Sequence, residues 1–225
     1  MKLRVFSLAV VVVSMGSTAL AQNQVQNSGF DTAAMLANWS AYASSAPDSV
    51  GTGTGVWDGT QDVSNNIPFS GSAHVDFAAT PTNGNAAYGV SQCVDLSAGA
   101  LQPVMSATFG TRFEVRTGQT ASGGVNVTVE AAFFDAGSCG GNLLTAGSQG
   151  KNILMTDLVD GTWAASEILS PTFPIAPLAS PQSAQLRLVA RRVGTNSDTL
   201  SVFFDSAYLA VNGALPVTLQ NFEAE

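Results

Sequence analysis

Two aspartates near opposite ends of the sequence are the first candidates for chemistry. Asp205 lies in the middle of residues 201–209, a run whose two alternating faces are both largely apolar. Such a strand belongs inside a sheet that is covered on both sides, where a carboxylate needs a cation, an arginine or several backbone N–H groups as partners. Asp31 ends the motif Asn-Ser-Gly-Phe-Asp far upstream. A sandwich whose first and last strands meet would bring these two carboxylates to one ion.

A second group of candidates lies on three predicted strands, residues 104–116, 125–134 and 185–192. Apolar side chains alternate along them with Arg, Glu, Asn, Thr and Gln, so a shared sheet would present one polar face. An ordinary solvated face and a ligand-binding platform both fit this pattern. On a platform, planar Arg, Asn and Gln groups would exchange paired hydrogen bonds with vicinal hydroxyls. The candidate residues are Arg112, Asn126, Gln185 and Arg187.

Catalysis has one candidate, the pair Glu114 and Glu130. If their strands pair, both carboxylates point to the polar face, as the acid and the nucleophile of a glycosidase would. However, Arg112 and Arg116 flank Glu114 and would lower the pKa of its carboxyl group, which weakens it as a proton donor. The sequence has no Gly-x-Ser-x-Gly motif, and His74 is its only histidine. Salt bridges on a sheet face explain the two glutamates better.

The first 21 residues have the organisation of a secretory signal peptide. A basic start precedes an apolar stretch, residues 5–15, and a small-x-small cleavage site that ends at Ala21. We expect cleavage after Ala21, a single domain over residues 22–212 and a short C-terminal tail over residues 213–225. The predicted location is secreted, extracellular or periplasmic, and no stretch is long enough for a transmembrane helix.

The net charge and the cysteine content exclude several classes of partner and chemistry. Without the signal peptide, six basic and 16 acidic residues remain, and this net charge of −10 excludes nucleic acid as a partner. Cys93 and Cys139 are the only cysteines of an exported chain, so we expect one disulfide between them. Neither cysteine has the spacing of a zinc site or of a thiol-redox motif.

Short alternating runs bounded by Gly, Ser, Thr, Asn or Pro recur along the mature chain, with no long helical period and no internal repeat. We predict strands at residues 24–30, 72–78, 87–94, 104–116, 125–134, 163–169, 185–192 and 201–209. Their number and spacing indicate an all-β sandwich or barrel. Residues 44–70 form a long segment rich in Gly, Ser, Thr and Asn, which is typical of functional or mobile loops.

Six short motifs stand in a recognisable order along the mature chain. They are Asn-x-Gly-Phe-Asp (27–31), Trp39, Ser-Gly-Ser-Ala (70–73), Ser-Gln-x-Val-x-Leu (91–96), Gly-Thr-Trp (161–163) and Phe-Phe-Asp (203–205). In this order they resemble the jelly-roll carbohydrate-binding modules of families four, nine and twenty-two, within the galactose-binding-like group. The resemblance covers nearly the whole mature chain and implies a two-sheet β-sandwich of jelly-roll type. It implies the fold more specifically than the binding of sugar.

The resemblance also implies a structural calcium ion. Matched by motif, Asp31 and Asp205 would supply carboxylates, while Gly29 and Ala73 would supply backbone carbonyls, with help near Ser70. Calcium takes such a mixture of oxygen ligands. The related modules often carry a carboxylate where this chain has Ser70, which leaves two charged ligands. In the alternative arrangement, Asp31 caps a turn and Asp205 pairs with an arginine.

Aromatic side chains that stack on sugar rings would complete such a site. Trp57 lies in the long segment, where it has no evident core role, and Tyr88 lies close to where the related modules carry a stacking aromatic residue. Each could equally fill an apolar site beneath a loop. Trp39 and Trp163 match core positions of the pattern. The aromatic content of 8% argues against strong polysaccharide binding.

We therefore expect a secreted, non-catalytic module that recognises an oligo- or polysaccharide on its polar sheet face. The alternative is a cell-surface or matrix protein that uses the same fold as a rigid spacer or adhesion unit. A jelly-roll glycoside hydrolase that uses Glu114 and Glu130 is the third possibility. The sequence leaves the glycan, the oligomeric state and the role of the tail open.

Overall fold

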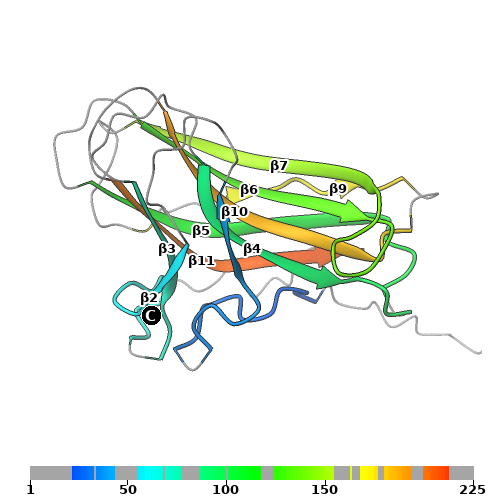
Figure 1. Cartoon of the computed structure of the whole chain (residues 1–225), viewed down its shortest axis with the longest axis horizontal. Coiled ribbons are helices and arrows are strands. Elements are labelled where there is room, and N and C mark those ends of the chain that lie inside the picture. The colour runs from blue at the N-terminus through cyan, green and yellow to red at the C-terminus, as the bar shows by residue number, and fades with distance from the viewer. Residues whose placement is uncertain are drawn as a thin grey trace, which may run out of the picture.

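The computed structural model describes residues 22–32, 34–43, 55–67, 69–77, 87–99, 101–117, 124–154, 163, 168–176, 180–193 and 200–212. Within these ranges every regular element is a β-strand, and no helix is long and apolar enough to cross a membrane. The strands form two antiparallel sheets that pack on each other as a β-sandwich (Figure 1). The predicted fold class is confirmed, whereas the predicted signal peptide and C-terminal tail lie outside the described residues.

The five-stranded sheet, sheet A, has the strand order β1-β4-β10-β6-β7. Buried and accessible residues alternate most clearly along β6, where one face is buried and the other is accessible. Val127 and Val129, for example, are fully buried, while the alternate residues Thr128 and Glu130 are half-buried. The strands are β1 Ser40–Ala43, β4 Ala87–Asp95, β10 Ser183–Val193, β6 Gly124–Phe134 and β7 Leu143–Leu154.

The six-stranded sheet, sheet B, has the order β2-β3-β11-β5-β8, and β9 also pairs with β5. Its central strand β11 contains the run that is apolar on both faces, as the sequence predicts. A β-bulge between Asp205 and Tyr208, with Ser206 at φ 49°, reverses the alternation, so Phe204 and Leu209 both belong to the core. The strands are β2 Val56–Asp58, β3 Ser72–Phe77, β11 Leu200–Val211, β5 Ser106–Thr117, β8 Ile168–Leu169 and β9 Phe173–Pro174.

The core between the sheets consists of the inward residues of both. Phe109 and Phe204 from sheet B meet Phe133, Leu186 and Leu188 from sheet A, and all five side chains are at most 1% exposed. Burial of one such side chain stabilises a fold by about 1.5–3 kcal/mol. A shift of one residue in strand register would expose a whole set of them, so the alternation fixes which residues face outward.

The N-terminal segment lies along the end of β11. The Gln24 amide donates a hydrogen bond to the Leu209 carbonyl (2.8 Å), and the Ala207 amide donates to the Ser28 carbonyl (2.9 Å). The expected meeting of the first segment with the last strand is therefore confirmed. The predicted strand at residues 24–30 is wrong, because Asn27 has φ 49° and the chain turns there.

The same segment also contacts sheet A and so closes one end of the sandwich. Gln92, an inward residue of β4, accepts a hydrogen bond from the Gln26 amide (2.7 Å) and donates one to the Gln26 carbonyl (2.8 Å). The Trp39 side chain is buried as predicted, and its Nε1 donates to the Asn27 carbonyl (3.2 Å). These contacts fix the segment that leads to Asp31.

Two other predictions of strands need correction. The run at residues 163–169 is reduced to β8, with Trp163 forming an isolated bridge to Glu114, and residues 164–167 lie outside the described ranges. The long strand β7 was not predicted, because its sequence, LLTAGSQGKNIL, is rich in small and polar residues. This composition is understandable at a sheet edge, where much of the strand is solvent-exposed. Short strands β1, β2 and β9 were also missed.

Candidate functional site

The outer face of sheet A, called here the polar face, is organised in rows that cross the strands. One row includes a residue from every strand of the sheet and is polar throughout. Adjacent strands are about 4.8 Å apart, so the row is about 19 Å long. A line of hydrogen-bonding groups of this length suits an extended ligand that crosses the strands. This central row consists, by register, of Ser148, Glu130, Arg187, Ser91 and Ser40; Ser91 is buried, and the other four are accessible.

Arg187 lies in the middle of the central row and is held by contacts on three sides. Its Nε and Nη2 donate to Oε1 of Gln185 at 2.9 and 2.5 Å, and its Nη1 lies 3.8 Å from Oε2 of Glu130. Its Cζ lies 5.0 Å from the centre of the Tyr42 ring. The side chains of Arg187 and Glu130 remain 33% and 31% exposed. An ion pair this exposed adds little stability, so the main effect of these contacts is to orient the guanidinium group.

A pocket of about 460 Å³ opens on the polar face beside the central row. Ala132 and Ala146, which face each other in register, contribute small side chains to its lining. Gln185 lines it from the neighbouring strand β10. Phe134 and Leu143 line it where β6 turns into β7, and Leu143 is 58% exposed.

The structure brings together part of the predicted hydrogen-bonding set. Gln185 and Arg187 are in contact, and Asn126 lies on the same face, four residues along β6 from Glu130, or about 13 Å. Asn126 is engaged on both sides of its amide, with Asn152 (2.7 Å) and with Thr128 (2.6 Å).

Arg112 does not belong to this face. Its strand, β5, is part of sheet B, where Arg112 is in register with Asp205 of β11. The prediction that Arg112 joins Gln185 and Arg187 is therefore wrong. It depended on the assumption that three polar-faced strands share one sheet, whereas only β6 and β10 do.

Tyr88 is a core residue, and its predicted role in stacking on a ligand is wrong. Register places it opposite Ala190 on the inward face of sheet A, and it is 3% exposed. Its ring packs edge-to-face on Phe77 with the centroids 5.4 Å apart. A ligand on the polar face has no access to it.

Trp57 also has a structural role in place of the predicted stacking role. It is half-buried on edge strand β2 of sheet B and packs against the core. Its Nε1 donates to the Phe30 carbonyl at 2.9 Å. The ring lies against Gly71, where a Cβ atom would come within 2.8 Å of Nε1. Trp57 therefore fixes the loop that follows β2, at a distance from the polar face.

The two glutamates considered for catalysis lie on opposite sides of the sandwich. Glu130 is on the polar face of sheet A, whereas Glu114 is on β5 of sheet B, 1% exposed and paired with Arg116 Nε. The strands β5 and β6 do not pair, contrary to the condition on which the hypothesis depended. A glycosidase needs its two carboxyl groups about 5–9.5 Å apart across one sugar unit. Glu114 and Glu130 therefore do not form such a pair.

The three serines of the central row, and Tyr42 beside it, were not singled out from the sequence as site residues. Ser40, Ser91 and Ser148 carry no recognisable signal, because serine is common in any sheet. Tyr42 is the aromatic residue of the site, but it lies in a strand of four residues, Ser-Ala-Tyr-Ala, which is too short to show an alternation. Its role follows only from its position beside Arg187.

A buried acidic pair lies where the N-terminal segment meets β11. Asp205 is 1% exposed and accepts hydrogen bonds from the amides of Val63 (3.0 Å) and Ser206 (2.5 Å). Burial raises the pKa of Asp205 well above its usual value, against the effect of these two amides, and the neighbouring carboxyl group of Asp62 raises it further.

Asp62 behaves in the opposite way. Burial also disfavours its charged form, but hydrogen bonds from the Asn66 amide (2.5 Å) and from the Ser64 hydroxyl (2.9 Å) lower its pKa below the usual value. The carboxyl groups of Asp62 and Asp205 share a hydrogen bond. The opposite directions of the two pKa shifts make Asp62 the more readily ionised member of the pair.

The oxygen atoms around this pair fit a calcium ion. The Ser70 hydroxyl donates to the Gly29 carbonyl (2.7 Å), and a Cβ placed on Gly29 would lie 4.0 Å from Oδ1 of Asp205. Carboxylate, carbonyl and hydroxyl oxygens are the donors that calcium selects. Among the described residues, no three His, Cys, Asp or Glu side chains come together, so such an ion would depend on the uncharged oxygens and on water as well.

Asp62, and not the predicted Asp31, faces Asp205. Asp31 is exposed, and its carbonyl accepts hydrogen bonds from the amides of Ala34 (2.9 Å) and Met35 (2.7 Å), so it begins a turn. Ala73 lies within β3, between strands β2 and β11. The sequence does not point to Asp62, because it lies in the long segment 44–70, whose composition shows no register.

The predicted disulfide between Cys93 and Cys139 is confirmed, with its Cα atoms 5.8 Å apart. Cys93 lies beside Gln185 on the polar face, and Cys139 belongs to the loop that joins β6 to β7. The Cys139 amide donates to the Ser183 hydroxyl (2.9 Å), which in turn donates to the Ala136 carbonyl (2.5 Å). The loop is thus fixed over the start of β10.

Comparison with known proteins gives only distant similarities. No family model matches the sequence, and no curated protein is significantly similar to it. One similar solved structure is the xylan-binding domain from CBM 22, with 13% identity, 83% of this chain and 94% of that chain covered, and a TM-score of 0.47. Another is the C-terminal family 22 carbohydrate-binding module of Clostridium thermocellum Xyn10B, with 14% identity, 85% of this chain and 100% of that chain covered, and a TM-score of 0.46. A third is CBM28, a module specific for non-crystalline cellulose, with 13% identity, 84% of this chain and 96% of that chain covered, and a TM-score of 0.44. The fold class rests on the strand pairing described above and not on these similarities.

Proposed function

We propose that this protein is a non-catalytic carbohydrate-binding module that holds an oligo- or polysaccharide across the polar face of sheet A. The observation that supports this proposal is the central row. It offers hydroxyl, carboxylate and guanidinium groups along a straight line, with the Tyr42 ring at its β1 end. Sugars carry vicinal hydroxyls that both donate and accept hydrogen bonds, so they match such a mixed line of groups.

The charge balance of the row favours an uncharged ligand. Arg187 faces Glu130 and is the donor to Gln185 Oε1, so its positive charge is already compensated. Hydroxyl groups can join such a network without adding a charge. Because the network orients Arg187 before a ligand arrives, binding loses less side-chain entropy than it would with a free arginine.

We further propose that a calcium ion binds at Asp62 and Asp205 and stabilises the fold. Asp62, Asp205, the Gly29 carbonyl and the Ser70 hydroxyl would hold the ion, with Ala73 as a further ligand expected from the resemblance and Asp62 in the place expected for Asp31. The site joins the 61–70 loop, the N-terminal segment and β11, and the polar face is on the other sheet. Its role would therefore be structural.

Secretion is the third part of the proposal. The N-terminal 21 residues have the composition of a signal peptide, and the one disulfide is of the kind that persists outside the cytoplasm. We expect the mature chain to begin at Gln22.

A glycan array followed by affinity electrophoresis on soluble polysaccharides tests the binding function directly. The mature protein should be retarded in gels that contain its ligand and unaffected in gels without it. If a protein with the native disulfide and a cooperative unfolding transition binds no glycan, the proposal is wrong, and a rigid spacer or adhesion unit becomes the better explanation.

A further inference from the structure

The pocket shares Glu130, Arg187 and Ser148 with the central row along one side. The rest of its side-chain lining is mostly apolar and comes from Ala132, Ala146, Phe134 and Leu143. A volume of about 460 Å³ lies in the range of small-molecule sites and is large enough for one sugar unit with a substituent. A plain sugar hydroxyl would gain no hydrogen bond from these four apolar side chains.

Gln185 adds a directed donor beside these apolar side chains. A guanidinium group has only donors, so the amide of Gln185 must turn its oxygen toward Arg187, whose Nε and Nη2 both donate to it. The amide orientation is thereby fixed, and Nε2 points away from Arg187. Since Gln185 itself lines the pocket, its NH2 group is available to an acceptor there.

Phe134 and Leu143 border the pocket where β6 turns into β7. The loop of residues 135–142 is cross-linked through the Cys93–Cys139 disulfide to β4. Within the loop, the amide and the side-chain Nδ2 of Asn142 donate to the Asp135 carboxylate at 2.7 and 2.8 Å. A glycan chain that crosses the strands along the central row passes beside the pocket. A group that projects from such a chain can therefore enter the pocket.

We infer that this pocket binds an acyl substituent of the glycan, such as an O-acetyl or N-acetyl group on a sugar unit that lies on the central row. The acyl methyl would contact the alanines, Phe134 and Leu143, and the acyl carbonyl would accept a hydrogen bond from Gln185 Nε2. An acyl group has this combination of an apolar end and a single acceptor, which hydroxyl and carboxylate substituents lack. The inference rests on the proposed carbohydrate-binding function and specifies the class of glycan.

The test compares acylated glycans with plain ones. One pair is O-acetylated xylan and the same xylan after alkaline deacetylation. A second is N-acetylchitohexaose and cellohexaose, two β-1,4-linked hexamers that carry an acetamido group or a hydroxyl group, respectively, at C2 of each unit. Dissociation constants come from affinity electrophoresis for the polymers and from calorimetry for the hexamers. One hydrogen bond and one buried methyl group predict about tenfold tighter binding of the acylated member in at least one pair. The first pair identifies an O-acyl ligand and the second an N-acyl ligand.

Two variants locate the effect in the pocket. Ala146→Leu fills the pocket from an exposed position on β7, and Gln185→Glu replaces the amide donor with an acceptor; each should bring the affinity ratio of the acylated and plain glycans close to one. Ala41→Leu, on the exposed edge strand β1, is the matched control and should keep the wild-type ratio. Equal binding of both members of each pair, or an unchanged ratio in Ala146→Leu, would overturn the inference but leave the proposed function intact. Absence of binding to every glycan would refute both.

Discussion

The carboxyl groups of Asp62 and Asp205 share a hydrogen bond in the buried end of the sandwich, although one belongs to a loop and the other to the central strand of sheet B. Two carboxylates in contact repel each other when both are ionised, so such a pair needs a shared proton or a cation. The raised pKa of Asp205 and the lowered pKa of Asp62 are two sides of this one relationship.

Calcium should replace the shared proton and stabilise the protein. At a concentration 100 times its dissociation constant, a ligand of the folded state adds about 2.7 kcal/mol to the free energy of unfolding. For a chain of this size that corresponds to a rise in Tm of roughly 5–10 °C, which calorimetry in calcium and in chelator would measure. Asp62→Ala and Asp205→Ala should each abolish the difference, whereas Asp31→Ala, whose side chain is exposed, should retain most of it. A Tm that does not respond to calcium would refute the site.

The pH dependence of stability without calcium should carry the signature of Asp205. Its pKa is raised in the folded protein, so between about pH 4 and this raised pKa the folded state holds a proton that the unfolded state has lost. The free energy of unfolding should therefore decrease as the pH rises above about 4, by up to about 1.4 kcal/mol per pH unit. Asp62, with its lowered pKa, acts in the opposite sense and loses its contribution only as the pH falls below about 4.

Urea unfolding between pH 4 and 8 in chelator would measure this slope. Asp205→Asn imitates the protonated carboxyl group and should flatten the slope relative to the wild-type protein. If the two proteins show parallel pH profiles, Asp205 is not protonated in the folded state.

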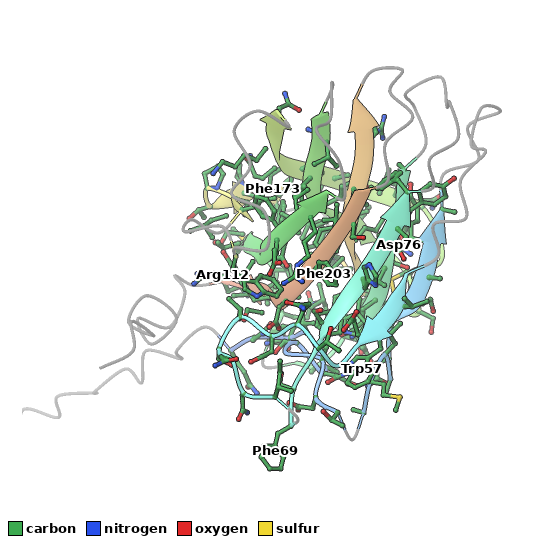
Figure 2. All side chains as sticks on the ribbon, turned by 90° about the vertical axis from the view of Figure 1, so that its left-hand side faces the viewer. Trp57, Phe69, Asp76, Arg112, Phe173 and Phe203 are labelled. Atoms are coloured by element: carbon green, nitrogen blue, oxygen red, sulfur yellow. A yellow bond between two sulfur atoms is a disulfide. The ribbon has the colours of Figure 1, made fainter. Side chains whose placement is uncertain are left out.

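Tyr42 should be the aromatic residue on which glycan binding depends. Tyr42→Ala removes the ring against which the Arg187 guanidinium lies, and the loss of one stacking or cation–π contact predicts about five- to tenfold weaker binding. Phe69→Ala is the matched control, because Phe69 is 72% exposed and projects from a loop away from both sheets (Figure 2). If both substitutions weaken binding equally, the ligand does not lie on the central row.

The architecture could be predicted from the sequence wherever alternation was strong. The runs in β5, β6, β10 and β11 gave the strands and the two-sheet fold, because period-2 patterns of Val, Leu and Phe determine which face is buried. Which strands share a sheet was not encoded in those patterns. Arg112 and Arg187 therefore seemed equivalent in the sequence, although they lie on opposite faces of the sandwich.

The site residues were predictable only where a long strand carries them. Gln185 and Arg187 follow from the alternation of β10, whereas Tyr42 and Asp62 lie in a four-residue strand and in a loop, whose conformations depend on tertiary contacts. The error for Tyr88 has a similar origin. The residues of β4 from Ala87 to Gln92 are buried on both faces of the strand, so the sequence of β4 does not distinguish inward from outward residues.

The assignment of Tyr88 to the core can be tested first by measuring stability. The Tyr88 hydroxyl is buried and has no hydrogen-bond partner among the residues that the structure describes. Tyr88→Phe therefore removes an unsatisfied polar group and should leave stability unchanged or raise it by up to about 1 kcal/mol. Tyr88→Ala, by contrast, leaves a cavity against Phe77 and should cost about 3–5 kcal/mol in the free energy of unfolding. Urea titrations of the three proteins would measure these differences.

Binding completes the same test, because a stacking residue and a core residue respond differently to loss of the ring. Tyr88→Leu keeps an apolar side chain in the core, so we expect a folded protein that is less stable but binds glycan with the wild-type dissociation constant. Tyr42→Leu should weaken binding without a comparable loss of stability, since Tyr42 lies on the accessible face at the sheet edge. The opposite pattern, with binding lost in Tyr88→Leu and retained in Tyr42→Leu, would mean that the ligand reaches the inner side of β4, and the polar face would no longer explain recognition.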